Sequence, residues 1–392
     1  MSSNDSAVLA LVDEAAPADP NPMAELHAML DQMVENSIRI PGKPAWILMC
    51  GYAIGETVEV CSLIDAFTKH HGHGVILVVM PKHAALAKMY AHRCLKVLVM
   101  EDEWMRAFLR SNYIPQDRFE LDQPISACWI DRGFRNSDGI KYLGLYPERG
   151  GISEMDMMRF VLRLPWNSRL DAPRIVPDAE ERAWQLGRQN GLRLGRSVLL
   201  CPINNSAKKL PDVFWTAVAA RLTELGFTVF TNMGGLTPFN GLATMPIANT
   251  IPVDLPIDLV IPFVHLCGRV ITGTNGISFL IMMGGLKTFK MTQLLAHSKD
   301  EQEGHSSLGV RSPYPPKGHV MVASHLYAAP ELAMGMPLNE FLVAYDESPE
   351  ELQRMARVVA EQDTSDPASV RRYAGNGRPY LEEHADWLRD MA

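Results

Sequence analysis

The second half of the chain contains two segments in which an apolar run leads directly into a polar turn and then into a helix-like stretch. The first is a strand-like run over 196–204, followed by Asn205-Ser-Ala-Lys-Lys-Leu-Pro-Asp212 and an amphipathic segment over 214–225. The second runs from Arg269 through Thr274-Asn-Gly-Ile-Ser278. Turns at the carboxyl ends of parallel strands meet at one edge of a sheet, where N–H groups, a hydroxyl and an ammonium can hold a phosphorylated ligand. This pattern predicts an α/β sheet that binds such a ligand.

The first half alternates in the same way. Ala45–Cys50 is a continuous apolar run, typical of a buried strand, and a second such run covers 75–80. Between them, apolar residues fall on one face of a helix at Val60, Leu63, Ile64 and Phe67. A strand, a helix and a strand in this order predict a parallel sheet.

The length of the chain and the order of its elements predict two α/β domains. A segment containing several prolines, Pro165–Pro177, is the candidate linker between them. The chain after Pro337 looks mostly helical. We therefore expect a flexible acidic leader over 1–22, an N-terminal domain over 23–170, a C-terminal domain over 178–345 and a helical segment over 346–392.

Composition excludes several classes of protein. The net charge of -8 argues against wholesale binding of nucleic acid. The six cysteines are scattered without a C-x-x-C pair, and His70, His71 and His73 fall on a helix-ending turn, so we expect no metal site and no disulfide framework. Without a signal peptide or a membrane-length apolar run, the protein is expected in the cytoplasm, and peripheral contact with the inner face of the membrane stays open.

The two turns of the second half supply the candidate residues for binding the phosphorylated ligand, the sugar donor of the reaction considered below. Two lysines crowd the first turn, and a lysine near a helix N-terminus is a natural phosphate partner, although a solvated loop is the alternative. In the second turn, backbone N–H groups of 275–277 can hold a diphosphate, and the alternative is a tight turn in which Ser or Thr caps a helix. The candidates are Asn204, Asn205, Ser206, Lys208, Lys209, Thr274, Asn275, Gly276, Ile277 and Ser278.

The turn Gly51–Glu56 follows the first strand of the chain. Glu56, at the start of a helix, is placed to act as a general base, and Gly55 lets a substrate approach the backbone. The alternative is that Glu56 is a first-turn acid favoured by the helix dipole. The turn lacks the G-x-G-x-x-G pattern, which argues against a nicotinamide oxidoreductase.

Three stretches of the chain resemble the bacterial lipopolysaccharide heptosyltransferase family. Ile47–Glu56 is similar to its opening strand and Gly-Asp turn, Lys208–Trp215 to its Lys-x-x-Pro-x-x-x-Trp stretch, and Thr274–Leu280 to its Asp-Thr-Gly-x-x-His-Leu signature. The resemblance implies the GT-B architecture, in which two Rossmann-like domains face a cleft. Among the departures from the family pattern, Glu56 and Thr274 each replace Asp, and Phe279 replaces His.

The resemblance also implies a function and assigns roles to residues. It makes Glu56 the catalytic base, gives Lys208 a donor phosphate, and puts Asn275 and Gly276 on the diphosphate-binding turn. The implied activity is an inverting, metal-independent glycosyltransferase of the hexosyl or heptosyl class, without a cofactor. It moves a sugar from a nucleotide-diphosphate donor to an acceptor hydroxyl in cell-surface glycan or glycoprotein assembly.

The acceptor is expected to be a glycan, a lipid-linked molecule or a protein, and to bind near Gly55, Glu56, Arg132 and Arg135. Two alternatives share the fold. One is a catalytically silent protein that binds a sugar nucleotide or acts as a scaffold, which the departures at Glu56, Thr274 and Phe279 favour. The other is a nucleotide-sugar epimerase, which turns over the donor without an acceptor.

Overall fold

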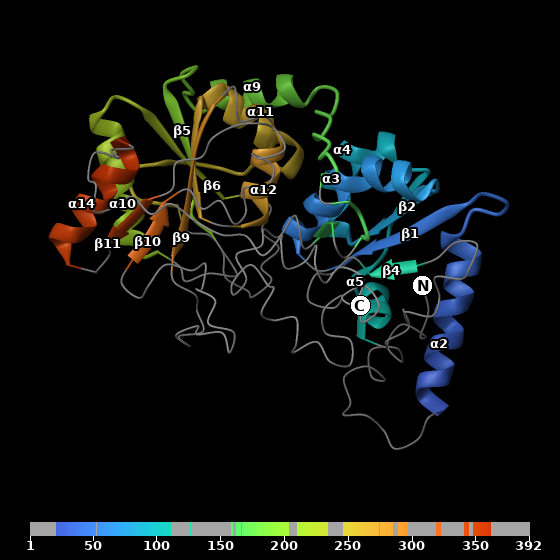
Figure 1. Ribbon diagram of the computed structural model, residues 1–392. Helices are drawn as coiled ribbons and strands as arrows, with labels where there is room; N and C mark the ends of the chain where they lie inside the picture. Colours follow the sequence, from blue (N-terminus) through green and yellow to red (C-terminus); the bar gives the residue numbers. More distant parts are fainter. Residues whose placement is uncertain are drawn as a thin grey trace. The chain divides into compact units, whose positions relative to one another are not determined.

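The chain forms two compact α/β units in a computed structural model (Figure 1). The described residues up to 171 belong to unit 1 and those from 172 onward to unit 2. Both units contain a sheet with parallel strands and helices packed on it, so the predicted α/β class is confirmed. The structure describes residues 21–51, 53–110, 125–127, 158–159, 162–165, 167–203, 210–233, 246–273, 275–284, 289–296, 319–322, 341–344 and 348–361.

Within the described residues, unit 1 has a four-stranded parallel sheet with the order β3-β2-β1-β4. The central strands are continuous apolar runs because helices cover both faces of the sheet. Side chains alternate between the faces, so Ile47 and Met49 lie in one apolar cluster with residues of α2 and α5. The strands are β1 (Ala45–Cys50), β2 (Gly74–Val79), β3 (Lys96–Val99) and β4 (Ile125–Ala127).

The helices of unit 1 lie on the two faces of this sheet, with α3 and α4 opposite α2 and α5 (Figure 1). The longest, α3, ends where Gly72 adopts a left-handed conformation with φ of 71°, which a glycine accepts without steric cost. The helices are α2 (Asn21–Met33) with a π-helical extension (Val34–Ile38), α3 (Ile54–His71), α4 (Ala84–Tyr90) between 3₁₀ turns η2 (Pro81–His83) and η3 (Ala91–Arg93), and α5 (Asp102–Arg110).

In unit 2 the described strands form a seven-stranded sheet with the order β11-β10-β9-β8-β5-β6-β7. The pairs from β9 to β7 are parallel, whereas β10 pairs antiparallel with both β9 and β11. The strands are β5 (Ser197–Cys201), β6 (Thr228–Asn232), β7 (Ile251–Val253), β8 (Arg269–Gly273), β9 (Lys290–Ala296), β10 (His319–Val322) and β11 (Phe341–Ala344).

The expectation of a mostly helical chain after Pro337 is wrong at Phe341–Ala344, which is strand β11. A four-residue apolar run has no periodicity that separates a strand from a buried helix turn. Its antiparallel pairing with β10, some twenty residues earlier, makes this run a strand, with Val322 opposite Phe341. Helix α14 (Pro349–Glu361) then follows, inside the segment that was expected to be helical.

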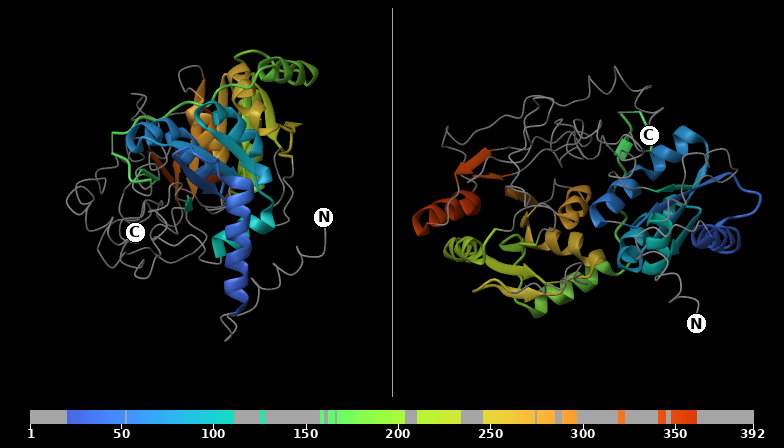
Figure 2. Two further views of the ribbon diagram at one scale, coloured as in Figure 1. Left: turned by 90° about the vertical axis from the view of Figure 1, so that its right-hand side faces the viewer. Right: turned by 90° about the horizontal axis from the view of Figure 1, so that it is seen from below.

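The other helices of unit 2 cover both faces of its sheet. Helices α10 and α14 lie side by side on one face, as Figure 1 and the right view of Figure 2 show, and share a core with Val198 and Leu200. Helices α9 and α11 pack on the opposite face, with Leu199 and Cys201. The helices are α9 (Ala179–Gln189), α10 (Asp212–Glu224), α11 (Ile257–Cys267) and α12 (Gly276–Met283).

A buried arginine fixes the end of α14. Arg269, 8% exposed at the start of β8, donates from its guanidinium to the carbonyl oxygens of Ala360 (2.7 Å) and Val359 (3.0 Å). Burial lowers the pKa of Arg269 to about 10, so it remains charged at neutral pH. A cation at a helix C-terminus complements the helix dipole, so Arg269 secures α14 to the sheet.

We expect Arg269→Ala to lower the free energy of unfolding by about 1.5 to 3 kcal/mol, because it leaves two buried carbonyl groups without their charged donor. Urea unfolding measures the change. Arg188→Ala, an exposed last-turn arginine of α9, is the matched control and should change stability by less than about 0.5 kcal/mol. Equal effects of the two changes would contradict the anchoring role of Arg269.

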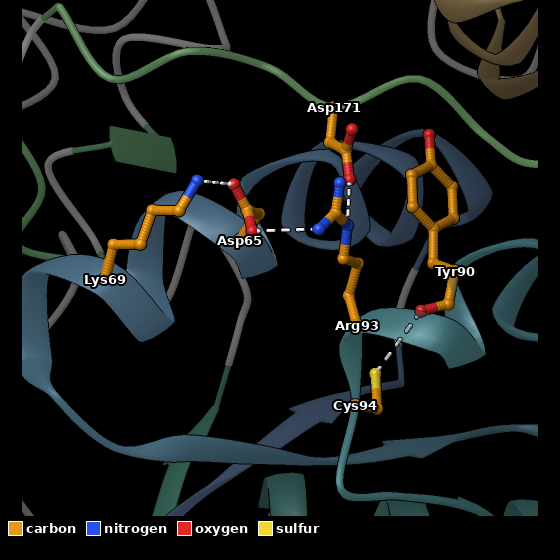
Figure 3. A network of polar contacts seen from close by, with 6 residues as sticks. All are labelled: Asp65, Lys69, Tyr90, Arg93, Cys94 and Asp171. Atoms are coloured by element: carbon orange, nitrogen blue, oxygen red, sulfur yellow. Dashed lines mark hydrogen bonds and ion pairs between the residues drawn. The ribbon is translucent and has the colours of Figure 1, made fainter.

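The chain leaves unit 1 at a network of ion pairs (Figure 3). The N–H of Asp171 donates to the carbonyl oxygen of Ser62 in α3 (2.8 Å), and its carboxylate accepts from Arg93 in η3. Arg93 also pairs with Asp65 (3.1 Å), which binds Lys69 (2.6 Å). These polar contacts hold the end of the segment 167–171 on unit 1.

On the far side of the boundary, Ile175 and Val176 pack against the core of unit 2. The chain is therefore anchored to unit 1 at Asp171 and to unit 2 from Ile175 onward. The stretch between these anchors is 172–174, inside the segment that the sequence indicated as the linker.

Candidate functional site

The carboxyl ends of β5 and β8 form the candidate site of unit 2. These strands are neighbours in the sheet, yet the chain goes from β5 to β6 on one side and reaches β8 on the other. Such a switch point is where open α/β sheets bind ligands. Cys201 pairs with Thr272, so the residues that follow each strand, Ile203 and Asn275, lie at the same edge.

Asn275 connects these two strand ends through its side chain. Its amide nitrogen donates to the carbonyl oxygen of Ile203, and its amide oxygen accepts from the N–H of Ser278 (2.8 Å). Asn275 is therefore the N-cap of α12 and at the same time the bridge to the end of β5. Asn275 thus joins the end of β5 to the start of α12, the two places next to which the sequence put the donor-site turns.

Ser278 completes the cap. Its hydroxyl donates to the carbonyl oxygen of Asn275 (2.6 Å) and accepts from the N–H of Asn275 (3.2 Å). It also accepts from the side-chain nitrogen of Gln293 in β9 (2.9 Å). Ser278 is fully buried, so it contributes to the site by shaping the first turn of α12.

Two backbone N–H groups at the start of α12 have no hydrogen-bond acceptor among the described residues. Within the residues that the structure describes, the N–H groups of Gly276 and Ile277 make no hydrogen bond, and both residues are half-buried. The first N–H groups of a helix lack intrahelical partners and lie at the positive end of its dipole. This arrangement can bind an anion such as a phosphate.

Several residues assigned to the site from the sequence lie outside the described part of the chain. They are Asn204, Asn205, Ser206, Lys208, Lys209 and Thr274 on the donor side, and Arg132 and Arg135 on the acceptor side. Phe279, where the related motif has His, is a buried core residue of α12.

In unit 1, Glu56 lies in the first turn of α3, at the carboxyl edge of β1. One of its carboxylate oxygens accepts from the N–H of Ala53, at 3.4 Å. This is the arrangement of a first-turn acid, and Glu56 as a whole is half-buried at the edge of the sheet. Gly55 belongs to the same helical turn, because α3 begins at Ile54 and not after Glu56.

His83, which is buried beside this turn, was not among the residues predicted for the site. Its Nδ1 lies 2.9 Å from the hydroxyl of Thr57, and that hydroxyl donates to the carbonyl oxygen of Ala53 (3.1 Å). Burial, with a smaller effect of the neighbouring Lys82 charge, lowers the pKa of His83 to about 3. A neutral His83 thus ties the first turn of α3 to η2.

The described residues contain neither a metal-binding cluster nor a membrane-spanning helix. No group of three or more His, Cys, Asp or Glu side chains there has an arrangement that would hold a metal ion. Among the helices described, none combines the length and the apolar character needed to cross a bilayer.

No protein-family model matches the chain, and no curated protein matches it. Among solved structures, a family 9 glycosyl transferase from Veillonella parvula is similar with a TM-score of 0.45 and 13% identity, over 65% of this chain and 82% of that one. ADP-heptose lipopolysaccharide heptosyltransferase II of E. coli has a TM-score of 0.40 and 13% identity, over 61% and 82% of the two chains.

A third similar structure is a dodecameric glycosyltransferase from enterotoxigenic E. coli, with a TM-score of 0.41 and 13% identity. The match covers 64% of this chain and 58% of that chain.

Proposed function

We propose that this protein is a glycosyltransferase that moves a sugar from a nucleotide-diphosphate donor to an acceptor hydroxyl, with inversion and without a metal. The observation that carries the proposal is the open N-terminus of α12, which Asn275 fastens to the end of β5. This helix start coincides with the stretch that resembles a diphosphate-binding turn. Diphosphate oxygens accept from the N–H groups of Gly276 and Ile277.

The donor binds unit 2, where Lys208 supplies a positive charge to the diphosphate and Asn204, Asn205, Ser206, Lys209 and Thr274 complete the site. The acceptor, a glycan, a lipid-linked molecule or a protein, binds unit 1 near Gly55, Arg132 and Arg135. Unit 1 supplies the base and unit 2 holds the leaving group, so both are needed for transfer.

In the reaction, the carboxylate of Glu56 takes the proton of the acceptor hydroxyl while the hydroxyl oxygen attacks the anomeric carbon. The bond between that carbon and the diphosphate oxygen breaks, and the diphosphate leaves with its electron pair. Its negative charge grows as the bond breaks, so N–H dipoles fixed in advance stabilise the transition state more than the bound donor.

A second candidate is a catalytically silent protein that binds a sugar nucleotide. It is favoured by the hydrogen bond from Ala53 to Glu56, since a helix-capping carboxylate has a structural role without any chemistry. The two candidates differ in turnover. Nucleotide binding without release of the diphosphate, with and without a panel of acceptors, identifies the silent protein, and turnover of the donor alone identifies an epimerase.

The donor site is tested by thermal unfolding with ADP, UDP, GDP and their free nucleosides. We expect one nucleoside diphosphate at about 100 times its Kd to stabilise the protein by about 2.7 kcal/mol, because it binds only the native state. The corresponding nucleoside, which lacks the diphosphate, should raise the Tm far less. If none of the three diphosphates raises the Tm, the proposed function is wrong.

A further inference from the structure

Gln293 is a buried amide in the interior of a strand, where Thr292 and Leu294 beside it are buried as well. It lies in β9 and is 3% exposed. Its Nε2 donates to the hydroxyl oxygen of Ser278, whereas its Oε1 is buried and has no hydrogen-bond partner among the described residues. An apolar side chain of the same shape would avoid this unsatisfied acceptor, so the amide needs an explanation beyond packing.

The hydrogen bonds around Ser278 define what Gln293 does. A serine hydroxyl has one proton, and at 2.6 Å it goes to the carbonyl oxygen of Asn275. The hydroxyl oxygen must then accept, and both groups that approach it are donors, the N–H of Asn275 and Nε2 of Gln293. Gln293 therefore fixes the hydroxyl in the one orientation that closes the cap of α12.

These contacts form a continuous chain across the edge of the sheet. It runs from Gln293 in β9 to Ser278 in α12, to Asn275 after β8, and to Ile203 after β5. The two open N–H groups, of Gly276 and Ile277, lie between Asn275 and Ser278 in the sequence. Their direction depends on both ends of this short turn.

We propose that Gln293 is a positioning residue of the nucleotide-diphosphate site, and this rests on the proposed function. It makes no contact with the donor. It holds Ser278, and through Ser278 and Asn275 it orients the N–H groups that receive the diphosphate. The buried Oε1 lacks a hydrogen-bond partner because the side chain places Nε2 where it donates to Ser278.

The test uses Gln293→Met in the full chain, because methionine fills a similar volume and cannot donate. Met291→Leu is the matched control, a volume-conserving change on the same strand and the same face. Two quantities are measured: amide hydrogen exchange of peptides that contain residues 275–279, and the Kd of the nucleoside diphosphate that stabilises the wild type, by calorimetry.

In Gln293→Met we expect faster exchange at 275–279, a Kd raised about fivefold to tenfold, and a Tm that does not fall, because the unsatisfied acceptor is gone. Met291→Leu should match the wild type in all three. Unchanged exchange at 275–279 overturns the inference whether or not a nucleotide binds. Faster exchange with an unchanged Kd overturns the role in binding.

A double-mutant cycle with Ser278→Ala covers the case in which Gln293→Met lowers the Tm. Both changes break the same link, so the double variant should bind the nucleotide no more weakly than the weaker single variant. Additive losses overturn the inference. If the wild type binds none of ADP, UDP and GDP while the exchange differs as expected, the proposed function fails and the positioning of α12 by Gln293 stands.

Discussion

Glu56→Gln is expected to slow sugar transfer by about 10²- to 10⁴-fold while the Kd of the nucleoside diphosphate stays unchanged. The amide has the shape of the carboxylate but cannot take the proton of an acceptor hydroxyl. Its oxygen can still accept from the N–H of Ala53, so the start of α3 is retained. The proposed donor-binding N–H groups belong to unit 2, which this change does not touch.

Glu103→Gln is the control for this change. Glu103 also lies in the first turn of a helix, α5, which follows a strand of the same parallel sheet. The two substitutions remove the same charge from the first turn of a helix, where each carboxylate interacts favourably with the helix dipole. Steady-state turnover with a fixed donor compares them, and Glu103→Gln should transfer at nearly the wild-type rate.

Near-normal turnover of Glu56→Gln would mean that Glu56 is only a first-turn acid, the alternative that its contact with Ala53 already supports. Equal losses in the two variants would point to a general effect of charge. Loss of donor binding in Glu56→Gln would show that the change disturbs more than the proton transfer. It would contradict the assignment of Glu56 as a base that takes no part in donor binding.

The sheets could be predicted because their central strands are continuous apolar runs. Ala45–Cys50 and Ser197–Cys201 are buried on both faces, so burial alone specifies them and no distant partner is needed to recognise them. Turn glycines mark the ends of helices for a similar local reason, as at Gly191 with φ of 75° after α9. Both signals are properties of a few consecutive residues.

The contacts that organise the site could not be predicted in this way. His83 meets Thr57 across 26 residues of sequence, and Gln293 meets Ser278 across 15. Each is a single polar residue without a spacing pattern, and only the fold brings it to its partner. The antiparallel strand β11 was missed for the same reason, since its pairing with β10 is what makes it a strand.

The second turn illustrates a different limit of sequence reasoning. Its residues suggested either a diphosphate site or a capped helix, as if these excluded each other. Asn275 and Ser278 are the cap, and the cap is what leaves the N–H groups of Gly276 and Ile277 open. The structural role of Asn275 and Ser278 is therefore compatible with a binding role for Gly276 and Ile277, which lie between them in the sequence.

Asn275→Ala should weaken binding of the nucleoside diphosphate by about 100-fold or more and lower the free energy of unfolding by about 1 to 2 kcal/mol. The stability loss comes from the missing cap, because the N–H of Ser278 loses its side-chain acceptor. The loss of binding has two sources. The first turn of α12 loosens, and the end of β5 at Ile203 is no longer held beside it.

Asn275→Ser separates these two sources. Serine is as good an N-cap as asparagine, so the free energy of unfolding should stay within about 0.5 kcal/mol of the wild type. Its side chain is too short to keep the hydrogen bond to the carbonyl oxygen of Ile203. If the bridge between β5 and α12 matters, Asn275→Ser binds the nucleotide more weakly at nearly unchanged stability. Wild-type affinity in Asn275→Ser would leave the cap as the only contribution of Asn275, and wild-type affinity in Asn275→Ala would place the diphosphate somewhere other than the start of α12.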